Sequence, residues 1–414
     1  MFEGLKKLGP GLLFAGAAIG VSHLVQSTRA GADFGLGLLW ALLLVNLFKY
    51  PFFQYGPRYA AATGENLLHG YYKLGKGILV IYFILNLATM FTIQTAVTIV
   101  TAGLAHSLFG DINLLGDGHW GVTSLQIWTL IVLLVCLFIL FLGRYKTLDK
   151  LIKFIILILT ISTLIAVTFA FLDTNKTIAF TQILPKNTTE IAFLIAFMGW
   201  MPAPLDISVW HSIWAVEKKK NEQAFSPKTA LLDFNIGYIG TIFLGISFLT
   251  LGYLVMNGSG ETFSNQATAF SNQLIELYTT ALGKWSFAII GIAALTTMFS
   301  TTLTTLDASP RAMTSSIELL LNKTFKKGYL FWILMLTLGT LFIFFMFASE
   351  MGLLIKIATI LSFITAPFYA IINLKLITSK HTPKKWRPTK MLQILSWLGV
   401  SFLIGFSVWY LTTL

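Results

Sequence analysis

Long stretches of the chain contain no Asp, Glu, Lys or Arg, and this feature most constrains the fold. Ile78–Thr101 and Val122–Leu142 are two such stretches, and about 20 apolar residues are enough for a helix to cross a bilayer. Of the 414 residues, 56% are hydrophobic and 11% are charged, whereas soluble proteins carry roughly 25% charged residues. A water-soluble fold is therefore excluded. We predict an all-α membrane protein with the lipid bilayer as its surroundings.

The apolar runs and their breaks predict eleven membrane-spanning helices. The expected crossings, numbered one to eleven, lie near 10–31, 35–57, 77–106, 122–143, 150–172, 190–214, 229–256, 284–308, 329–348, 351–376 and 393–412. The polar stretches between them are too short for a separate core, so we expect a single transmembrane domain over residues 1–414. Glu261–Leu282 has apolar residues scattered among polar ones, and we expect an interfacial helix there.

The basic residues of the chain are distributed unevenly among its loops. The balance of 29 basic and 17 acidic residues gives a net charge of +12, and most of the basic residues fall in alternate loops, on the side of the amino terminus. The positive-inside rule then predicts a plasma (inner) membrane protein with a cytoplasmic amino terminus and, after eleven crossings, an outer carboxyl terminus. Orientation accounts for the charge, so we expect no nucleic-acid partner.

Motifs of several enzyme classes are absent from the sequence. No GxxxxGK[ST] motif is present, so we expect no nucleotide, and no HExxH motif or Cys/His cluster indicates a zinc hydrolase. The single Cys136 lies inside an apolar run and has no second cysteine to pair with. We therefore expect no enzymatic activity and no cofactor.

Two crossings contain residues that interrupt helices. Crossing one has Gly20 ahead of Ser22 and His23, and crossing six has Pro202 and Pro204 at a similar depth. Proline removes a backbone donor, and glycine lowers the cost of unwinding. Freed carbonyls in lipid cost several kcal/mol each unless they line a cavity or bind something. We interpret both crossings as broken helices. The alternative is that the prolines only kink a packed helix and the glycines only permit close contact.

The spacing of the two breaks indicates an inverted repeat. Crossings one and six are each the first of five, and an odd number of crossings gives the two groups opposite topology. Secondary transporters with inverted repeats bind their substrate between two such discontinuous helices. We expect a first repeat over about 10–172, a second over about 190–376, and one extra helix over about 393–412.

Asp206 is the strongest candidate in the substrate site. It is the only carboxylate well inside a crossing, where insertion costs roughly 2.5–3.5 kcal/mol, so it needs a partner, a proton or a cation. His23 from the other break can ligate a metal as neutral imidazole or carry a proton. The alternative is a His–Asp pair that fixes helix packing. The predicted substrate-binding residues are Gly20, Ser22, His23, Ala203 and Asp206, with His23 and Asp206 as metal ligands.

Other polar residues suggest a proton or ion pathway. The candidates are His211, Gln94, Thr301, Thr304 and Asp307. Crossing eight is rich in hydroxyls, and several of these oxygens could coordinate a hard cation. The alternative is that they bond to their own helix or to a neighbouring one, as threonine usually does in membranes.

Several segments resemble one family of transporters. They are Gly9-Pro10-Gly11, Arg29-Ala30-Gly31-Ala32-Asp33-Phe34-Gly35, Leu39-Trp40, Arg58-Tyr59, Thr63-Gly64, His211-Ser212 and Ser300-Thr301-Thr302-Leu303-Thr304. Together they resemble the Nramp (natural resistance-associated macrophage protein) family of divalent-metal transporters. The resemblance implies the LeuT-type fold of two inverted five-helix repeats, import of ions such as manganese or iron, and often proton coupling.

The chain departs from the family pattern at the metal site. Gly20-Val21-Ser22-His23 stands where the family has Asp-Pro-Gly-Asn. The family's Met-Pro-His aligns with Pro204-Leu205-Asp206 or with Met201-Pro202-Ala203, and Ile78–His106 lacks the acids of the family's proton pathway. A thioether helps select transition metals. Without one in place, and with an added carboxylate, the site shifts toward harder ions or protonatable substrates.

Three functions remain open. The first is a secondary transporter of a divalent cation of the manganese, iron and magnesium class, working by alternating access. Asp206 then supplies charge, His23 supplies a nitrogen or proton site, and carbonyls near Gly20 and Ala203 complete the shell. The second is a carrier of a small organic solute, an amine or amino acid, on the same scaffold, with Trp200, Trp210 and Phe197 around a larger pocket. The third is a relative that has lost transport.

Overall fold

The computed structural model describes residues 9–112, 123–142, 145–173, 178–221, 225–260, 263–347 and 351–413. Within these ranges the regular elements are helices and no strand occurs, so the all-α prediction is confirmed. The long helices are α4 (Leu39–Thr63), α6 (Lys76–Phe109), α7 (Ser124–Leu142), α8 (Tyr145–Asp173), α11 (Pro227–Val255), α13 (Phe287–Leu321), α14 (Gly328–Phe347), α15 (Met351–Thr378) and α16 (Lys390–Leu411). The shorter ones are α2 (Pro10–Ala18), the π-helix η1 (Val21–Ser27), α3 (Thr28–Phe34), α5 (Leu67–Leu74), α9 (Thr188–Trp200), α10 (Ile207–Asn221) and α12 (Ala267–Leu282).

The helices match the expected crossings. Eight helical segments among the described residues are long and apolar enough to cross a membrane, and two shorter apolar helices, Ile156–Leu172 and Thr188–Trp200, lie within crossings five and six. Large apolar side chains such as Phe138, Leu142 and Phe342 point outward, each about two thirds exposed. Such a surface suits lipid. In chain order the crossings are α2 with α3, α4, α6, α7, α8, α9 with α10, α11, α13, α14, α15 and α16.

Both predicted helix breaks are confirmed. In crossing one, α2 ends at Ala18, Ile19 and Gly20 leave the helical conformation, and the chain resumes as η1 and α3. In crossing six, α9 ends at Trp200, and α10 begins only at Ile207. The intervening residues, 201–206, form no regular helix. The discontinuities therefore lie where glycine and proline interrupt the apolar pattern.

Helix α11 packs against the first crossing on both sides of its break. The approach is so close that a Cβ atom on Gly11 would lie 2.1 Å from the backbone oxygen of Asp233, and one on Gly31 would lie 1.9 Å from that of Leu249. The Asp233 carboxylate also accepts hydrogen bonds from the backbone N–H groups of Gly9 and Gly11, at 3.1 and 2.8 Å. Because the first N–H groups of a helix have no partner inside it, this contact fixes the start of α2.

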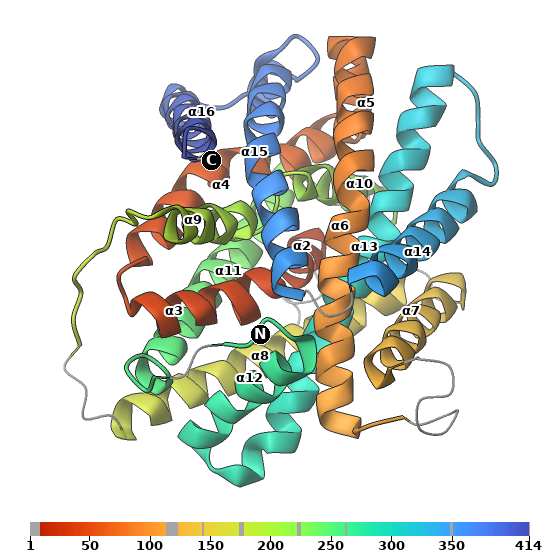
Figure 1. Cartoon of the computed structure of the whole chain (residues 1–414). Coiled ribbons are helices and arrows are strands. Elements are labelled where there is room, and N and C mark those ends of the chain that lie inside the picture. The colour runs from red at the N-terminus through yellow and green to blue at the C-terminus, as the bar shows by residue number, and fades with distance from the viewer. Residues whose placement is uncertain are drawn as a thin grey trace.

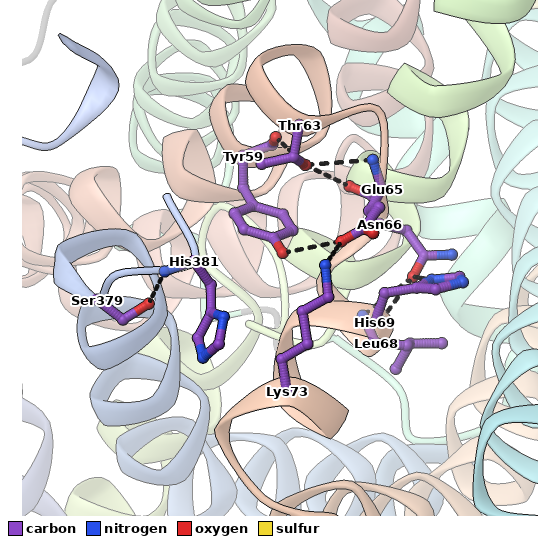
Figure 2. A network of polar contacts seen from close by, with 9 residues as sticks. All are labelled: Tyr59, Thr63, Glu65, Asn66, Leu68, His69, Lys73, Ser379 and His381. Carbon is purple, nitrogen blue, oxygen red and sulfur yellow. Dashed lines mark hydrogen bonds and ion pairs between the residues drawn. The ribbon is translucent and has the colours of Figure 1, made fainter. Parts of the chain in front are cut away.

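The corner between α4 and α5 is stabilised by polar contacts (Figure 2). Gly64 ends α4 in the left-handed region, with φ of 80°, and the Asn66 side chain accepts from the N–H groups of Leu68 and His69 at the start of α5. The Glu65 carboxylate pairs with the Lys73 ammonium. Helices α5 and α12 lie at opposite ends of the molecule, and α6 runs along most of its height (Figure 1). This placement fits two halves of opposite topology. Helix α12 corresponds to the expected interfacial helix, of which residues 261–262 fall outside the described residues.

Candidate functional site

The unwound stretch of crossing six contains a buried lysine. Lys49 of α4 is 0% exposed. Its ammonium lies 2.8 Å from the carbonyl oxygen of Met198, 2.7 Å from that of Gly199, 3.1 Å from that of Met201 and 3.2 Å from that of Ala203. An ammonium has three protons, so the four oxygens share them. Lys49 thus satisfies the backbone acceptors that the break of the helix exposes.

Asp206 lies in the same unwound stretch. It is 4% exposed, and neither carboxylate oxygen accepts a side-chain hydrogen bond within the described part of the chain. Asp206 lines a narrow crevice between α6 and α15 that has no room for a water molecule in this structure. This crevice is lined by Thr89, Pro204, Leu205, Asp206, Ser362, Thr365 and Tyr369. Four of these residues carry hydroxyls, so the acid is surrounded by neutral oxygen atoms.

Three tyrosines form a cluster beside Asp206. The ring of Tyr82 is 5.8 Å from that of Tyr71 and 6.0 Å from that of Tyr369, measured between centroids. Tyr369 lines the same crevice as Asp206, and the Tyr82 hydroxyl has no hydrogen-bond partner among the described residues.

His23 is held by its own neighbours rather than by Asp206. Its Nε2 atom lies 2.9 Å from the carbonyl oxygen of Thr241 in α11, and its Nδ1 atom lies 2.8 Å from the Ser22 hydroxyl and 3.1 Å from the oxygen of Ala18. A neutral ring with its proton on Nε2 donates to Thr241. No hydrogen bond between His23 and Asp206 occurs in the ranges described. Both ring nitrogens are occupied, so His23 connects η1 to α11.

The larger cavity lies directly between the two breaks and is mostly apolar. It offers about 20 Å³ of free space, which is room for about one water molecule. Its lining residues are Ala17, Ala18, Val21, Ser22, Ile93, Val97, Trp200, Pro204, Ile207, Trp210, Thr301 and Thr305. Neither His23 nor Asp206 is among them. Of the predicted substrate-binding set, Ser22 lines this cavity, whereas Ala203 contributes its carbonyl to Lys49.

Gly20 packs against α13. A Cβ atom there would lie 2.7 Å from the Thr301 hydroxyl oxygen. That hydroxyl lies 3.2 Å from the carbonyl oxygen of Gly16, 3.3 Å from that of Ile19 and 3.3 Å from that of Thr297 in its own helix, so these three acceptors share its proton. Thr301, which the sequence suggested as a pathway residue, therefore contacts the break in crossing one. Thr304 instead donates to the Ser300 oxygen of its own helix, at 2.6 Å.

The other predicted pathway residues lie apart from the charged pair. The His211 ring stacks on Phe14 at 5.5 Å, and neither of its nitrogens has a hydrogen-bond partner in the described ranges. Gln94 donates to the Thr302 oxygen at 3.3 Å. Asp307 accepts from Arg311 and from Tyr329, each at 2.7 Å. These contacts do not form a continuous chain of polar groups.

The donors available to a metal are oxygen atoms. The described residues contain no group of three or more His, Cys, Asp or Glu side chains that could hold a metal ion. An ion at Asp206 would therefore be completed by hydroxyl and carbonyl oxygens. Such a shell suits hard cations such as Mg²⁺ or Mn²⁺.

The sequence pattern did not reveal Lys49 or Asp233. Lys49 is the only basic residue in the interior of crossing two, as Asp206 is the only acid deep in crossing six. A pair of opposite charges at membrane depth was the signal available. Asp233 lies near the start of crossing seven, where a charge does not conflict with the apolar pattern and gives no sign of a buried contact.

Two helices unwound at corresponding points of two five-helix repeats, with buried charges at one of them, define a secondary transporter of the LeuT type. Residues 11–413 match the family described as natural resistance-associated macrophage protein-like. The chain belongs to this family, Nramp.

Two relatives cover nearly the whole chain. A protein of Pasteurella multocida without a described function is 36% identical over 410 residues, which cover 98% of this chain and 91% of the relative. The metal transporter Nramp6 of Arabidopsis thaliana is 20% identical, over 98% of this chain and 76% of the relative.

Solved structures show the same fold. The manganese transporter of Eremococcus coleocola superposes with a TM-score of 0.74 at 14% identity, over 98% of this chain and 86% of that one. MhsT in complex with L-phenylalanine gives a TM-score of 0.63 at 12% identity, over 96% and 98%. The LeuT-type fold with its two broken helices is thereby confirmed.

Proposed function

We propose that the protein is a secondary transporter of a divalent metal cation and that Asp206 is its anionic ligand. Family membership supports this proposal, as do the names of the metal transporter of Arabidopsis thaliana and the manganese transporter of Eremococcus coleocola. The observation that carries it is the Asp206 carboxylate. It is buried in an unwound stretch at membrane depth, without a side-chain hydrogen bond from any described residue.

The surroundings of Asp206 favour a hard ion. Thr89 and Ser362 donate their protons to the backbone oxygens of Leu85 and Ala358, at 3.0 and 2.8 Å. Ser362 also accepts from the Trp200 indole N–H at 2.8 Å, so two lone pairs of Thr89 and one of Ser362 are left for a cation. Carboxylate and hydroxyl oxygens suit Mg²⁺ and Mn²⁺, whereas thioether and thiolate ligands select softer ions. We therefore place Mg²⁺ and Mn²⁺ ahead of Fe²⁺ as substrates.

The other site residues have subordinate roles in the proposal. That His23 ligates the ion or carries a proton stays a prediction, because the ring would first have to give up its bond to Thr241. Ser22, which lines the neighbouring cavity, and Gly20, which packs against Thr301, stay predicted substrate contacts. We further propose proton coupling, residence in the plasma (inner) membrane, a cytoplasmic amino terminus and an outer carboxyl terminus. Alternating access would come from one helix bundle rocking against the other.

Uptake into proteoliposomes tests the function. Proteoliposomes with wild type, Asp206→Asn or the matched variant Asp111→Asn receive Mn²⁺, Mg²⁺ or small amines in the external buffer. Asp111 is the control because it is an exposed carboxylate, paired with His106, outside the predicted site. We expect wild type and Asp111→Asn to take up a divalent ion and Asp206→Asn to lose at least 90% of the rate. Uptake of the ion at the wild-type rate by a folded Asp206→Asn would contradict the proposal.

A second candidate rests on the larger cavity. Its lining is mostly apolar and includes two tryptophans, and the Trp210 indole N–H has no hydrogen-bond partner in the part of the chain that the structure describes. A small organic solute with an acceptor group would satisfy that donor. In the same uptake assay, transport of amines or amino acids without any divalent ion would favour this candidate. A folded protein that transports none of these would favour a relative without transport activity.

A further inference from the structure

The surroundings of the Lys49 ammonium resemble a binding site for a small cation. Four carbonyl oxygens, those of Met198, Gly199, Met201 and Ala203, lie 2.7 to 3.2 Å from its nitrogen. Rings of backbone carbonyls bind monovalent cations in channels, where they replace water around the ion. Here the oxygens come from the end of α9 and from the unwound residues after it.

The end of α9 attracts positive charge for two further reasons. The last carbonyls of a helix have no partner inside it, and the macrodipole gives the carboxyl end of a helix a partial negative charge. Close packing also fixes this end in place, because a Cβ atom on Gly199 would lie 2.1 Å from the backbone oxygen of Thr359 in α15. The carbonyl cage is therefore held by the neighbouring helix rather than by Lys49 alone.

We propose that these four carbonyl oxygens form a monovalent-cation site and that the ammonium of Lys49 occupies it as a tethered cation. The same ammonium contacts Met201 and Ala203 of the unwound stretch that also contains the buried Asp206 carboxylate. A tethered cation remains in the protein when the substrate leaves. The break in crossing six therefore keeps its shape without a free sodium or potassium ion. The site then supplies no sodium or potassium ion for transport together with the substrate.

Removing the side chain should open the site to free cations. We propose to purify the full chain as wild type, Lys49→Met and the matched control Lys73→Met, in which the lysine removed is 41% exposed and pairs with Glu65. The Tm of each is measured in choline, sodium, potassium and ammonium chloride at one ionic strength, with a chelator present to remove divalent ions. A ligand that binds only the folded state raises Tm in a saturable way.

We expect wild type and Lys73→Met to have the same Tm in all four salts. Lys49→Met should have a lower Tm in choline and a saturable rise in Tm with ammonium, potassium or sodium. A folded Lys49→Met whose Tm is the same in every salt would overturn the proposal. Equal cation dependence in wild type would overturn it as well, because the site would then be open while Lys49 is present.

A double variant covers the case in which Lys49→Met does not fold. Lys49→Met with Asp206→Asn removes both buried charges, so we expect it to recover folded protein and to show the same rise in Tm with small cations. A double variant that folds no better than the single one, or that folds without cation dependence, would overturn the proposal. No divalent ion enters these measurements, so their result is independent of whether metal uptake is found.

Discussion

The two broken helices of this protein hold corresponding positions in the two repeats but differ in chemistry. At the break in crossing one, neutral groups satisfy the freed backbone: the Thr301 hydroxyl faces the carbonyls of Gly16 and Ile19, and Ser22 donates to Ala18. At the break in crossing six, a lysine ammonium contacts four carbonyls, and a carboxylate follows in the same stretch.

This difference distinguishes two roles of a broken helix, which are to hold an unwound backbone and to place charged groups in the membrane. Neutral hydrogen bonds contribute about 0.5–1.5 kcal/mol each, which is enough to hold an unwound shape. Buried charges cost several kcal/mol to place in lipid unless they are paired or functional. The break in crossing six therefore has the buried charges around it, and the break in crossing one has close-packed neutral groups.

The largest effect on stability should come from the cation of crossing six. Lys49→Met leaves four buried carbonyls without the ammonium that contacts them, and each buried polar group left without a partner costs about 1–3 kcal/mol in the free energy of unfolding, so the total loss should exceed that of the variants below. Lys73→Met removes an exposed ion pair and should cost about 0–1 kcal/mol. Unfolding in detergent with increasing denaturant measures both. Equal losses of unfolding free energy for Lys49→Met and Lys73→Met would contradict the claim that a buried cation stabilises the break in crossing six.

The next effect should come from filling the space at Gly20. Gly20→Val places a side chain against Thr301, and overpacking of this kind costs about 1–3 kcal/mol. Thr301→Ala in the same chain removes the obstructing atoms and should recover part of the loss. The free energy of unfolding of the two single variants and the double variant gives the coupling. Additive losses would show that the two residues do not meet.

A comparable or smaller effect is expected at His23. His23→Ala removes the donor to Thr241 and should cost about 1–3 kcal/mol because a buried carbonyl loses its partner. His23→Gln keeps an N–H donor and should recover part of this loss. Titration of His23→Gln with Mn²⁺ then tests the predicted ligand role. A strong loss of Mn²⁺ affinity at nearly wild-type stability would establish His23 as a ligand, and unchanged affinity would leave it as a connection between helices.

The smallest effect should distinguish two threonines of α13. Thr301→Val removes the hydroxyl that faces the end of α2 and should cost about 1 kcal/mol. Thr304 bonds only to its own helix among the contacts described, so Thr304→Val should cost less. Thermal unfolding of the two variants side by side measures the difference. A larger loss for Thr304→Val would contradict the assignment of Thr301 to the break.

The sequence predicted the fold and both breaks because the signals are local. Uncharged runs of membrane length mark the helices, and Gly20, Pro202 and Pro204 interrupt them. Asp206 was also predictable, since a carboxylate deep in an apolar run is costly. Each of these signals lies within one segment of the chain.

The partners within the site were not predictable because they come from distant segments. Lys49 is 149 residues from Met198, and no local pattern brings the two together. The expected pairing of His23 with Asp206 rested on their similar depth alone. In the structure His23 instead contacts Thr241, 218 residues away. Depth in the membrane does not fix the direction in which a side chain leaves an irregular stretch.

Anomalous scattering from manganese tests the central claim most directly. Crystals of the wild-type protein and of Asp206→Asn would be soaked in Mn²⁺ and measured near the manganese absorption edge. We predict a wild-type peak within coordination distance of the Asp206 carboxylate, on the side of Thr89 and Ser362, and no such peak in Asp206→Asn. A peak at His23 and Ser22 that persists in Asp206→Asn would contradict the account.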